Sequence, residues 1–423
     1  MVTVSASLYL RATGYITVDS AQPLQPVLET CPNLILQHPK VGKDLVKNYV
    51  VAVIAMAHLN SPSELPNNSI REGGESQSRD VRIGLYPVAQ LSTIKLAGLQ
   101  HGDEEEAEEL LRSAREDGFF YLDLQDSAFE GMINVVEDMF TISKMLFNLD
   151  SLEKMEYDVD KLGNLKLNGY KPIGRNYGGV NGKRDGFESY TIPGKIKVDP
   201  SFRRPSLLTD HLPTLETFTS TTHRVLNLLL QSLSSSLQLP PEGALINLHR
   251  EQSPSPDIVR LLKYHAQPPN EQGYPQAPHT DLGSLTILFA HSPGLQVLRS
   301  SSSDWAYVLP KPGHAIVNIG DGLTLLTNGL LRSCLHRVAP IKGYSMTERY
   351  SFAYLQRAQY EVRMTGLTGS DIIPVKRGNV ETEQVFTSRE WLGKKFGMLR
   401  KETFEEGTEG SWVLTGQREE VPV

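Results

Sequence analysis

Two histidines and one aspartate, far apart in the sequence, constrain the fold of this chain more than any other feature. His279 and Asp281 are separated by one residue, and His336 follows 55 positions after Asp281. Residues i and i+2 of a strand point to the same side, so His279 and Asp281 can face one site. The third side chain must return to them through several strands and hairpins. This spacing is unlike a short zinc-binding loop and favours a metal site inside a β structure.

Short apolar segments between turns predict that β structure. They are VRLLKY (259–264), SLTILF (284–289), GLQVL (294–298), AIVNI (315–319), LTLLT (323–327), SCLHRV (333–338) and RYSFAYL (349–355). Asn328-Gly329 follows LTLLT and predicts a hairpin turn that sends the chain back toward His336. We therefore expect an α+β protein with a mainly β core, folded as a double-stranded β-helix, which is a cupin-like jelly roll.

Helical periodicity lies mostly outside this region. Apolar residues recur at helical spacing over 103–116, 129–148 and 213–237, and a C-terminal helix is expected over 388–400. Residues 119–124 predict a buried strand. Residues 157–204, rich in Gly, Lys and Asn, predict a long loop on the substrate side of the molecule. We expect the helices and this strand to form an N-terminal subdomain that flanks the β core.

Composition restricts the class of partner and the compartment. The net charge of −7 and the pI near 5.9 argue against nucleic-acid binding, which requires clustered Lys and Arg. Cys31 and Cys334 are the two cysteines, which favours a reducing compartment. The N-terminal residues lack a basic signal-peptide region, and the apolar run 49–57 is too short to span a membrane. We expect a cytoplasmic protein that acts on a small molecule.

The chemistry of the three residues points to iron. Two imidazoles and one carboxylate on one face of a metal leave adjacent positions open, as in non-haem Fe(II) oxygenases that bind a co-substrate and O₂. Arg349 and Ser351 share one strand face, where a guanidinium and a hydroxyl suit the distal carboxylate of 2-oxoglutarate. Tyr264 can add a phenol contact, although the sequence is equally consistent with a tyrosine that only packs in the core.

Several longer motifs carry a resemblance to a known family. They include DGFFYLDL (117–124), PHTDLGSLTILF (278–289), PGHAIVNIGDGLTLLTNGLLRSCLHRV (312–338) and RYSFAYLQRA (349–358). Over about residues 82 to 403 the chain resembles iron(II)- and 2-oxoglutarate-dependent oxygenases of the isopenicillin N synthase-like group, especially filamentous-fungal members. Two departures concern the co-substrate site: Leu262 stands where plant members usually have Asn, and the spacing from His336 to Arg349 is longer than in those members.

The resemblance implies a function and a set of site residues. His279, Asp281 and His336 would be the catalytic iron ligands, and the co-substrate contacts would be Arg349, Ser351 and Tyr264. The protein would use Fe(II), 2-oxoglutarate and O₂ to hydroxylate, desaturate or otherwise oxidise a small organic molecule, in secondary-metabolite biosynthesis.

A domain division follows from the resemblance and the composition. Residues 1–81 would be an N-terminal extension with a flexible linker over 60–80, and residues 82–240 an N-terminal oxygenase subdomain. The Fe(II)/2-oxoglutarate jelly roll would span 241–360, and a C-terminal helix and charged tail would occupy 361–423.

Alternatives remain open at this level. One is an iron oxidase like isopenicillin N synthase, which uses no 2-oxoglutarate; another is a catalytically silent metal-binding jelly roll; a zinc hydrolase is disfavoured because no separate general base is identifiable. Asp321, in a Gly-Asp-Gly sequence, predicts a turn in which its carboxylate bonds its own backbone. The oligomeric state is not predicted.

Other side chains in these regions have weaker readings. His265, His291 and His314 are expected to be structural or surface residues rather than metal ligands. The substrate pocket is expected to be lined by the 157–204 loop and by strand residues near two positions on the β core. The two core positions are Phe289 and Arg357, and the candidates in the loop are Tyr170, Lys171, Arg175 and Tyr190.

Overall fold

A computed structural model describes residues 8–10, 16–18, 82–83, 86–163, 165–176, 184–267, 275–299, 302, 304–341, 346–375 and 385–399. The chain divides into two compact units, Met1–Arg79 and Asp80–Val423. In the first unit, β1 (Leu8–Leu10) and β2 (Ile16–Val18) pair as antiparallel strands. The linker predicted over 60–80 lies outside the described residues. The second unit holds the predicted metal-binding residues.

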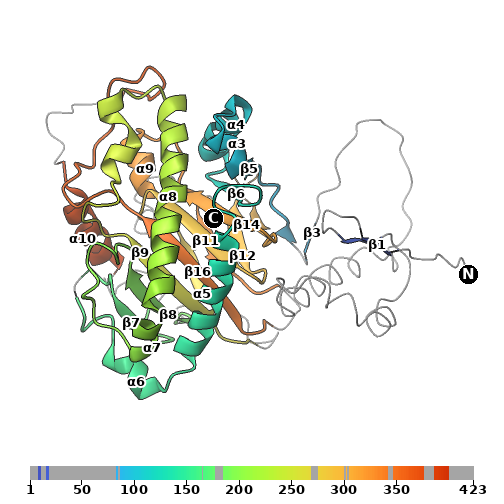
Figure 1. The fold of residues 1–423 in the computed structure, drawn as a ribbon, viewed down its shortest axis with the longest axis vertical. Coiled ribbons are helices and arrows are strands. Elements are labelled where there is room, and N and C mark those ends of the chain that lie inside the picture. Colours follow the sequence, from blue (N-terminus) through green and yellow to red (C-terminus); the bar gives the residue numbers. More distant parts are fainter. Residues whose placement is uncertain are drawn as a thin grey trace, which may run out of the picture. The chain divides into compact units, whose positions relative to one another are not determined.

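An eight-stranded sheet forms the centre of the second unit (Figure 1). Its strands pair antiparallel, except that the edge strand β5 runs parallel to β6. In spatial order they are β5 (Thr93–Lys95), β6 (Phe119–Asp123), β14 (His314–Ile319), β11 (Leu285–Ala290), β16 (Arg349–Gln356), β9 (Ile258–Tyr264), β8 (Phe187–Pro193) and β7 (Gly169–Lys171).

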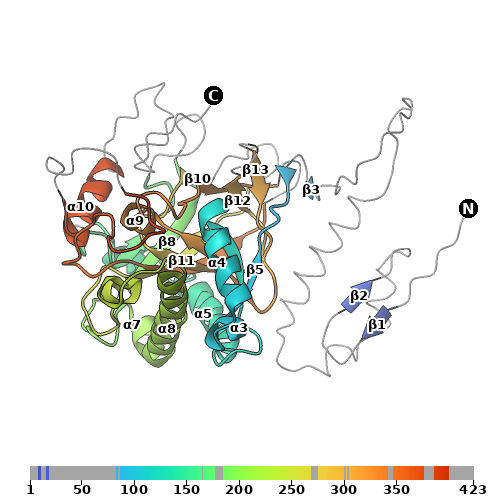
Figure 2. The ribbon, with the colours of Figure 1, turned by 90° about the horizontal axis from the view of Figure 1, so that it is seen from above.

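A second sheet completes a jelly roll. It has four antiparallel strands in the order β10 (Gln276–His279), β15 (His336–Val338), β12 (Leu295–Leu298) and β13 (Trp305–Tyr307). Figure 2 shows β10, β12 and β13 on one side of the molecule and helices α5 and α8 on the other. The chain crosses repeatedly between the two sheets, as the alternation of strand numbers shows. The predicted double-stranded β-helix is confirmed.

Helices cover one face of the large sheet because their apolar stripes match its apolar side. The longest are α5 (Met132–Phe147) and α8 (Leu212–Ser236), which pack on each other and on β16. Phe218 of α8 meets Phe352 of β16 edge to face, with ring centroids 5.4 Å apart. Burial of these large side chains stabilises each by roughly 1.5–3 kcal/mol relative to exposure.

The predicted helices agree closely with the observed ones. Helix α4 (Glu104–Glu116) begins after Asp103, whose carboxylate accepts hydrogen bonds from the backbone N–H groups of Glu105 and Glu106. Its first turn is acidic, which favours the positive end of the helix dipole. The remaining helices are α3 (Leu96–Gln100), α6 (Ser151–Glu156), α7 (Ser206–Asp210), α9 (Asp321–Leu326) and α10 (Ser388–Leu399), with 3₁₀ turns η3 (Pro241–Gly243) and η4 (Leu245–Leu248), and a β3 (Arg82–Ile83) and β4 (Tyr86–Pro87) ribbon.

The opposite face of the large sheet, here called the inner face, looks into the jelly roll. Alternate residues of a strand share a face, so the register fixes its membership. On β9 the inner residues are Arg260, Leu262 and Tyr264, which pair with Ala353, Ser351 and Arg349 of β16. The residues between them, such as Leu261 and Phe352, belong to the helix-covered core. The predicted co-substrate residues therefore lie on the inner face.

The segment LTLLT, predicted as a strand, is helical and forms most of α9. Asn328 and Gly329 both have positive φ, as the sequence indicates, but they end this helix instead of joining two strands. The Gly329 N–H donates to the Thr324 carbonyl over 2.8 Å, a helix-terminating bond. Three leucines within five residues fit a buried helical turn as well as a strand, and the pattern could not separate the two.

The region 157–204, predicted as one long loop, contains β7 and β8. Both extend the large sheet beyond β9 and are buried over most of their length. Polar residues such as Glu188 made these strands look like a loop in the sequence, because their ionic partners allow them to be buried: Lys154 Nζ lies 2.9 Å from the Glu188 carboxylate.

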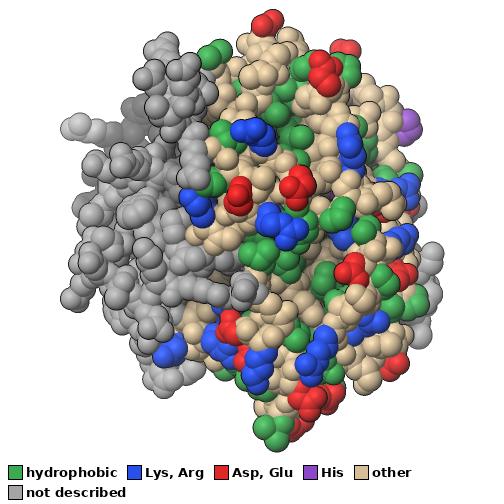
Figure 3. Space-filling model, turned by 90° about the vertical axis from the view of Figure 1, so that its left-hand side faces the viewer, with side chains coloured by type: hydrophobic (Ala, Val, Ile, Leu, Met, Phe, Trp, Pro, Cys, Tyr) green, Lys and Arg blue, Asp and Glu red, His purple; other side chains and the backbone are tan. Residues whose placement is uncertain are grey.

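Among the described helices, none is long and apolar enough to cross a bilayer. On the face shown in Figure 3, Lys and Arg side chains are interspersed with Asp and Glu.

Candidate metal and co-substrate site

Strand pairing brings the two histidines of the predicted metal site together. His279 ends β10 and lies directly opposite His336, the first residue of β15. Asp281 follows two residues after His279, where the chain leaves the sheet. The interval of 55 residues is thus spanned by β11 to β14 and α9 before the chain returns to the same point.

The three side chains form a cluster that one metal ion can occupy. One ligand atom from each of His279, Asp281 and His336 lies within 4.8 Å of the others. The two Nε2 atoms lie 4.0 and 3.9 Å from Asp281 Oδ1. The His279 side chain keeps 24% of its accessible surface, whereas His336 keeps 9%, so the cluster opens on the His279 side.

Backbone carbonyls orient both rings. His279 Nδ1 lies 2.9 Å from the Ala277 carbonyl, and His336 Nδ1 lies 3.1 Å from the Cys334 carbonyl. A carbonyl oxygen accepts only, so each Nδ1 carries the proton and each Nε2 presents a lone pair to the cluster. Phe119 packs edge to face on His336, with ring centroids 5.3 Å apart, and limits rotation of that ring.

The protonation states of the cluster residues suit a bound cation. Burial, together with the charge of the neighbouring His336, lowers the pKa of His279 to about 4. Burial alone would raise the pKa of Asp281, but the two histidines and a hydrogen bond from Asn318 bring it down to about 2. Asn318 Nδ2 donates to Asp281 Oδ2 over 2.9 Å. At neutral pH, His279 is therefore neutral and Asp281 ionised, as metal ligation requires.

Two glycines allow the loop after Asp281 to pack closely on its surroundings. A Cβ at Gly320 would lie 2.2 Å from the Gly283 carbonyl oxygen, and a Cβ at Gly283 would lie 2.5 Å from the Gln356 carbonyl oxygen. The backbone N–H of Asp321 donates to the Asp281 carbonyl over 2.8 Å. This close packing fixes the backbone that carries the aspartate.

Asp321 supports the same loop with its side chain. Its Oδ2 accepts a hydrogen bond from the Thr280 hydroxyl over 3.1 Å and lies 3.3 Å from Lys395 Nζ of α10. We predicted a turn in which this carboxylate bonds its own backbone; it bonds Thr280 and Lys395 instead. It is a structural neighbour of the metal cluster rather than a member of it.

Arg349, Ser351 and Tyr264 form a second cluster on the inner face. The Arg349 guanidinium donates through Nη1 to Ser351 Oγ over 3.1 Å and through Nε to the Ser292 carbonyl over 3.2 Å. It lies 5.0 Å from the centre of the Tyr264 ring. Arg349 is buried and makes no ion pair with a described carboxylate. A buried cation without an anionic partner is costly, so this cluster suits a carboxylate ligand.

Gln276 connects the two clusters, and no sequence pattern selects it. Its Oε1 accepts from the Tyr264 hydroxyl over 2.6 Å, and its Nε2 lies 3.1 Å from His279 Nε2. A glutamine three residues before a predicted ligand has no distinctive pattern, so only the fold, which brings β10 of one sheet against β9 of the other, could identify it. The sequence likewise did not indicate Asn318.

The other histidines lie outside the metal cluster, as predicted. His265 Nε2 lies 3.1 Å from Glu188, His291 Nε2 lies 3.0 Å from Glu137, and His314 Nε2 lies 3.8 Å from Asp123. Each has one carboxylate neighbour. The described residues contain one group of metal-ligating side chains, which is His279, Asp281 and His336.

Most of the predicted substrate-pocket residues are engaged elsewhere. Tyr170, Tyr190 and Phe289 belong to the helix-covered core, so their placement in the pocket was wrong. Arg175 pairs with Asp158, and Lys171 pairs with Asp185 at 2.8 Å.

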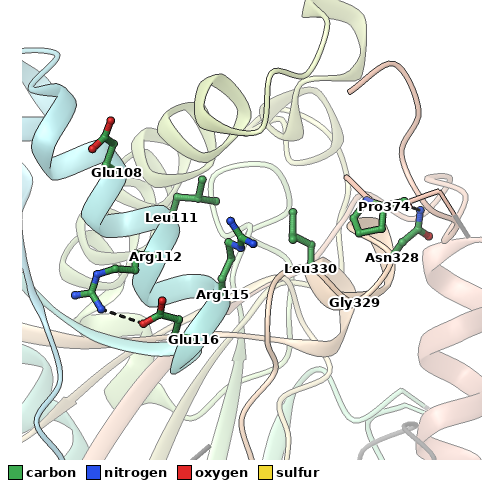
Figure 4. Close-up of a pocket in the computed structure, with 9 residues that line it drawn as sticks. All are labelled: Glu108, Leu111, Arg112, Arg115, Glu116, Asn328, Gly329, Leu330 and Pro374. Atoms are coloured by element: carbon green, nitrogen blue, oxygen red, sulfur yellow. Dashed lines mark hydrogen bonds and ion pairs between the residues drawn. The ribbon is translucent and has the colours of Figure 1, made fainter. Parts of the chain in front are cut away.

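A surface pocket of about 560 Å³ lies between α4 and the turn after α9, and it shares no lining residue with the metal cluster (Figure 4).

The residues present fit iron(II) and 2-oxoglutarate. Two imidazoles and one carboxylate form the donor set of a facial-triad iron site and leave positions for further ligands. The buried guanidinium of Arg349, with Ser351 beside it, offers the hydrogen-bond donors that a carboxylate accepts. Gln276 contacts a member of each cluster, so one small molecule can reach both.

Comparison with known protein families gives two matches. The 2OG-Fe(II) oxygenase superfamily matches residues 255–358, which include both clusters. The family described as non-haem dioxygenase in morphine synthesis N-terminal matches residues 87–210, the helical region and β7–β8. Together they account for most of the second unit.

Solved structures share this fold. The crystal structure of a full-length Neurospora crassa protein in complex with alpha-KG gives a TM-score of 0.59 at 22% identity, covering 73% of this chain and 95% of that one. A dioxygenase for auxin oxidation from rice gives a TM-score of 0.53 at 20% identity, with coverages of 73% and 95%.

Curated relatives from fungi are more similar in sequence. A 2-oxoglutarate-dependent dioxygenase of Gibberella zeae is 34% identical over 325 residues, which are 76% of this chain and 90% of the relative. The 2-oxoglutarate-dependent dioxygenase ecdG of Aspergillus rugulosus is 32% identical over 64% of this chain and 82% of the relative. These findings confirm the predicted family and its co-substrate. The chain belongs to the 2OG-Fe(II) oxygenase superfamily and is a 2-oxoglutarate-dependent dioxygenase.

Proposed function

We propose that this dioxygenase oxidises a small organic molecule in a secondary-metabolite pathway of the cytoplasm, with its chemistry centred on His279, Asp281 and His336. The observation that carries the assignment of roles is the pairing of His279 with His336 across β10 and β15, with Asp281 beside both. Resemblance to fungal dioxygenases supports the biosynthetic setting.

Each residue has a defined task in this proposal. His279, Asp281 and His336 would hold iron(II), which with 2-oxoglutarate and O₂ would supply the capacity to oxidise an unactivated carbon. The backbone carbonyls of Ala277 and Cys334 keep both Nε2 atoms directed at the metal. Asn318 holds the second oxygen of Asp281, so the carboxylate stays in one orientation.

The co-substrate is oriented from the other end of the inner face. Arg349 would bind its distal carboxylate, Ser351 would add one hydrogen bond, and the Tyr264 phenol, hydrogen-bonded to Gln276, would close the side of the pocket. Leu262, in place of the usual plant Asn, lies between Tyr264 and Arg260 on this face. It offers an apolar contact to the co-substrate chain.

Succinate formation tests this proposal. Purified protein with Fe(II), 2-oxoglutarate and O₂ should produce succinate slowly without a substrate and faster with an accepted one. We expect His336→Ala to abolish this activity, because it removes an iron ligand, and Arg349→Gln to raise the KM for 2-oxoglutarate strongly. His314→Ala, on β14 and outside the metal cluster, is the matched control and should retain activity.

Two results would contradict the assigned roles. Iron-loaded protein that forms no succinate under any of these conditions would indicate an iron oxidase or a silent binding module. Equal KM values for the wild type and Arg349→Gln would remove Arg349 from the co-substrate site.

A further inference from the structure

Arg260 occupies a position that the iron and co-substrate roles do not explain. It lies on the inner face of β9, paired with Thr191 of β8 on one side and Ala353 of β16 on the other. Ala353, its partner on β16, lies opposite Leu288 of β11, the strand that follows Asp281 in the chain, and the Arg260 charge interacts with those of Asp281 and His279. Nevertheless it makes no hydrogen bond or ion pair with any residue that the structure describes.

Arg357, just after β16, is a second cation at this end of the inner face. It is 4% exposed and is held by its neighbours: its backbone N–H donates to Asp257 over 2.8 Å, and Nη1 donates to the Pro256 carbonyl over 2.6 Å. Its Nε is buried without a hydrogen-bond partner. The charges of Arg260 and Arg357 act on each other and on Asp281.

The charges at this site do not balance once iron and co-substrate are present. The two positive charges of iron(II) cancel the two negative charges of 2-oxoglutarate. The buried carboxylate of Asp257 is offset by Lys195, whose Nζ lies 3.7 Å from it. This leaves the buried guanidinium groups of Arg349 and Arg357 and the partly exposed one of Arg260 against one carboxylate, Asp281. Buried charges of one sign are expensive unless a counter-ion joins them, so a further anion is favoured.

The strand register separates Arg260 from the co-substrate cluster. Ala353, the partner of Arg260, is four residues from Arg349 along β16, which is about 13 Å at the rise of a strand. Leu262 and Ser351 occupy the interval. Next to Ala353 on the same face lies Leu288 of β11. Apart from the charged groups of Arg357 and Asp281, the strand residues beside Arg260 on this face are therefore apolar except for Thr191.

We propose that Arg260, with Thr191 beside it and Arg357 behind it, binds a carboxylate of the primary substrate, so that the enzyme acts on small, largely apolar carboxylic acids. This inference rests on the proposed function and specifies its substrate class. The carboxylate would pair with the free donors of Arg260, and the apolar body of the acid would lie against the inner face near the metal.

Calorimetric titration can test this with a probe in place of the unknown substrate. Protein loaded with Mn(II), which replaces iron without turnover, is first titrated with 2-oxoglutarate. The saturated protein is then titrated with phenylacetate and, separately, with the uncharged phenylacetamide. Wild type, Arg260→Gln, Arg260→Lys and Arg349→Gln are compared, and Arg224→Gln, an exposed change on α8, is the matched control. Thermal melting of each variant reports whether it is folded.

The proposal predicts that wild type and Arg224→Gln bind phenylacetate at least about tenfold more tightly than phenylacetamide. Arg260→Gln should lose that preference, and Arg260→Lys should retain part of it. The affinity of Arg260→Gln for 2-oxoglutarate should stay within about twofold of wild type, whereas Arg349→Gln should bind the co-substrate far more weakly.

Three outcomes would overturn the proposal. Wild type that binds neither probe at millimolar concentration, or both equally, would exclude a carboxylate subsite. An unchanged preference in folded Arg260→Gln would remove that residue from it. Loss of 2-oxoglutarate affinity in Arg260→Gln would assign the guanidinium to the co-substrate instead. Failure of the wild type to bind 2-oxoglutarate would contradict the proposed function itself. The first titration measures this binding before any probe is added, so the two failures can be told apart.

Discussion

Individual residues around the metal cluster act through short chains of contacts. Asp321 touches no metal ligand with its side chain, but its carboxylate holds Thr280, the residue between His279 and Asp281. It also binds Lys395, so α10 is linked to the metal loop. Burial raises the pKa of Asp321, opposed by the charge of Lys395, which makes this contact sensitive to loss of either partner.

Asp321→Asn should weaken metal binding. The amide keeps the shape but removes the charge that faces buried Lys395, so the loop that carries Thr280 loses its anchor. We expect about a tenfold loss of affinity for Mn(II) or Fe(II), as is usual for changes beside ligating residues. Metal titration followed by calorimetry measures it. Asp304→Asn, at an exposed position, should behave as wild type, and equal affinities in both variants would refute the role of Asp321.

At the scale of elements, the site depends on backbones that approach each other without side chains between them. The loop after β10 packs on the start of α9 and on the end of β16. These segments are far apart in the sequence, and the glycines at their contacts are what allows the approach. A Gly-Asp-Gly sequence indicates a turn, but it cannot show that another backbone lies against it.

Gly320→Ala should therefore destabilise the protein. The added Cβ would lie 2.2 Å from the Gly283 carbonyl oxygen, and neither backbone can move without displacing Asp281. We expect a loss of about 2–3 kcal/mol in the free energy of unfolding, together with weaker metal binding. Denaturant unfolding measures the first quantity. Gly131→Ala, where nothing lies within 4 Å of the new Cβ, is the control; equal stability of the two variants would contradict the packing argument.

The elements that could be predicted from the sequence are those with a long period or a clear cap. Helices α4, α5 and α8 have several turns of apolar spacing, and α4 also has an Asp cap. The LTLLT segment was predicted wrongly because three leucines within five residues suit a buried helical turn and a strand equally. Strand β8 was not predicted because its buried polar residues, Glu188 among them, are stabilised by partners that only the fold brings near them.

For the whole molecule, buried neutral histidines couple stability to pH. Burial lowers the pKa of His249 to about 4, and its Nε2 bonds Ser284 Oγ near the metal loop. His279 has a similarly lowered pKa. A histidine whose pKa is lower in the folded state stabilises the fold above its unfolded pKa, and that stability is lost as the pH falls toward the folded value.

The metal-free protein should thus lose stability between about pH 6.5 and pH 4, by up to roughly 3 kcal/mol for each of these histidines. Below about pH 4, protonation of Asp257 and Asp281, whose pKa values are near 2, adds a further loss. Denaturant midpoints measured across this range test the claim. His249→Gln should flatten the upper part of the profile, while His101→Gln, at an exposed position, should not. An unchanged profile in His249→Gln would contradict it.

The metal site was predictable from the sequence, whereas its surroundings were not. His279, Asp281 and His336 carry a spacing that few folds explain, and the Arg349–Ser351 pair has the period of a strand. Gln276, Asn318 and Arg260 have no such pattern, and their importance comes from the register of β9, β10 and β14 with their neighbours. Tyr190 and Phe289 were misplaced because a sequence does not show which face of a strand meets the helices.

The most direct test of the account is an anaerobic visible titration of metal-free protein with Fe(II) and then 2-oxoglutarate. We predict a weak charge-transfer band that requires both additions, is absent in His279→Ala and needs far more 2-oxoglutarate in Arg349→Ala. No band despite bound iron, or an Arg349→Ala titration equal to that of wild type, would contradict the assignment of the metal and co-substrate sites.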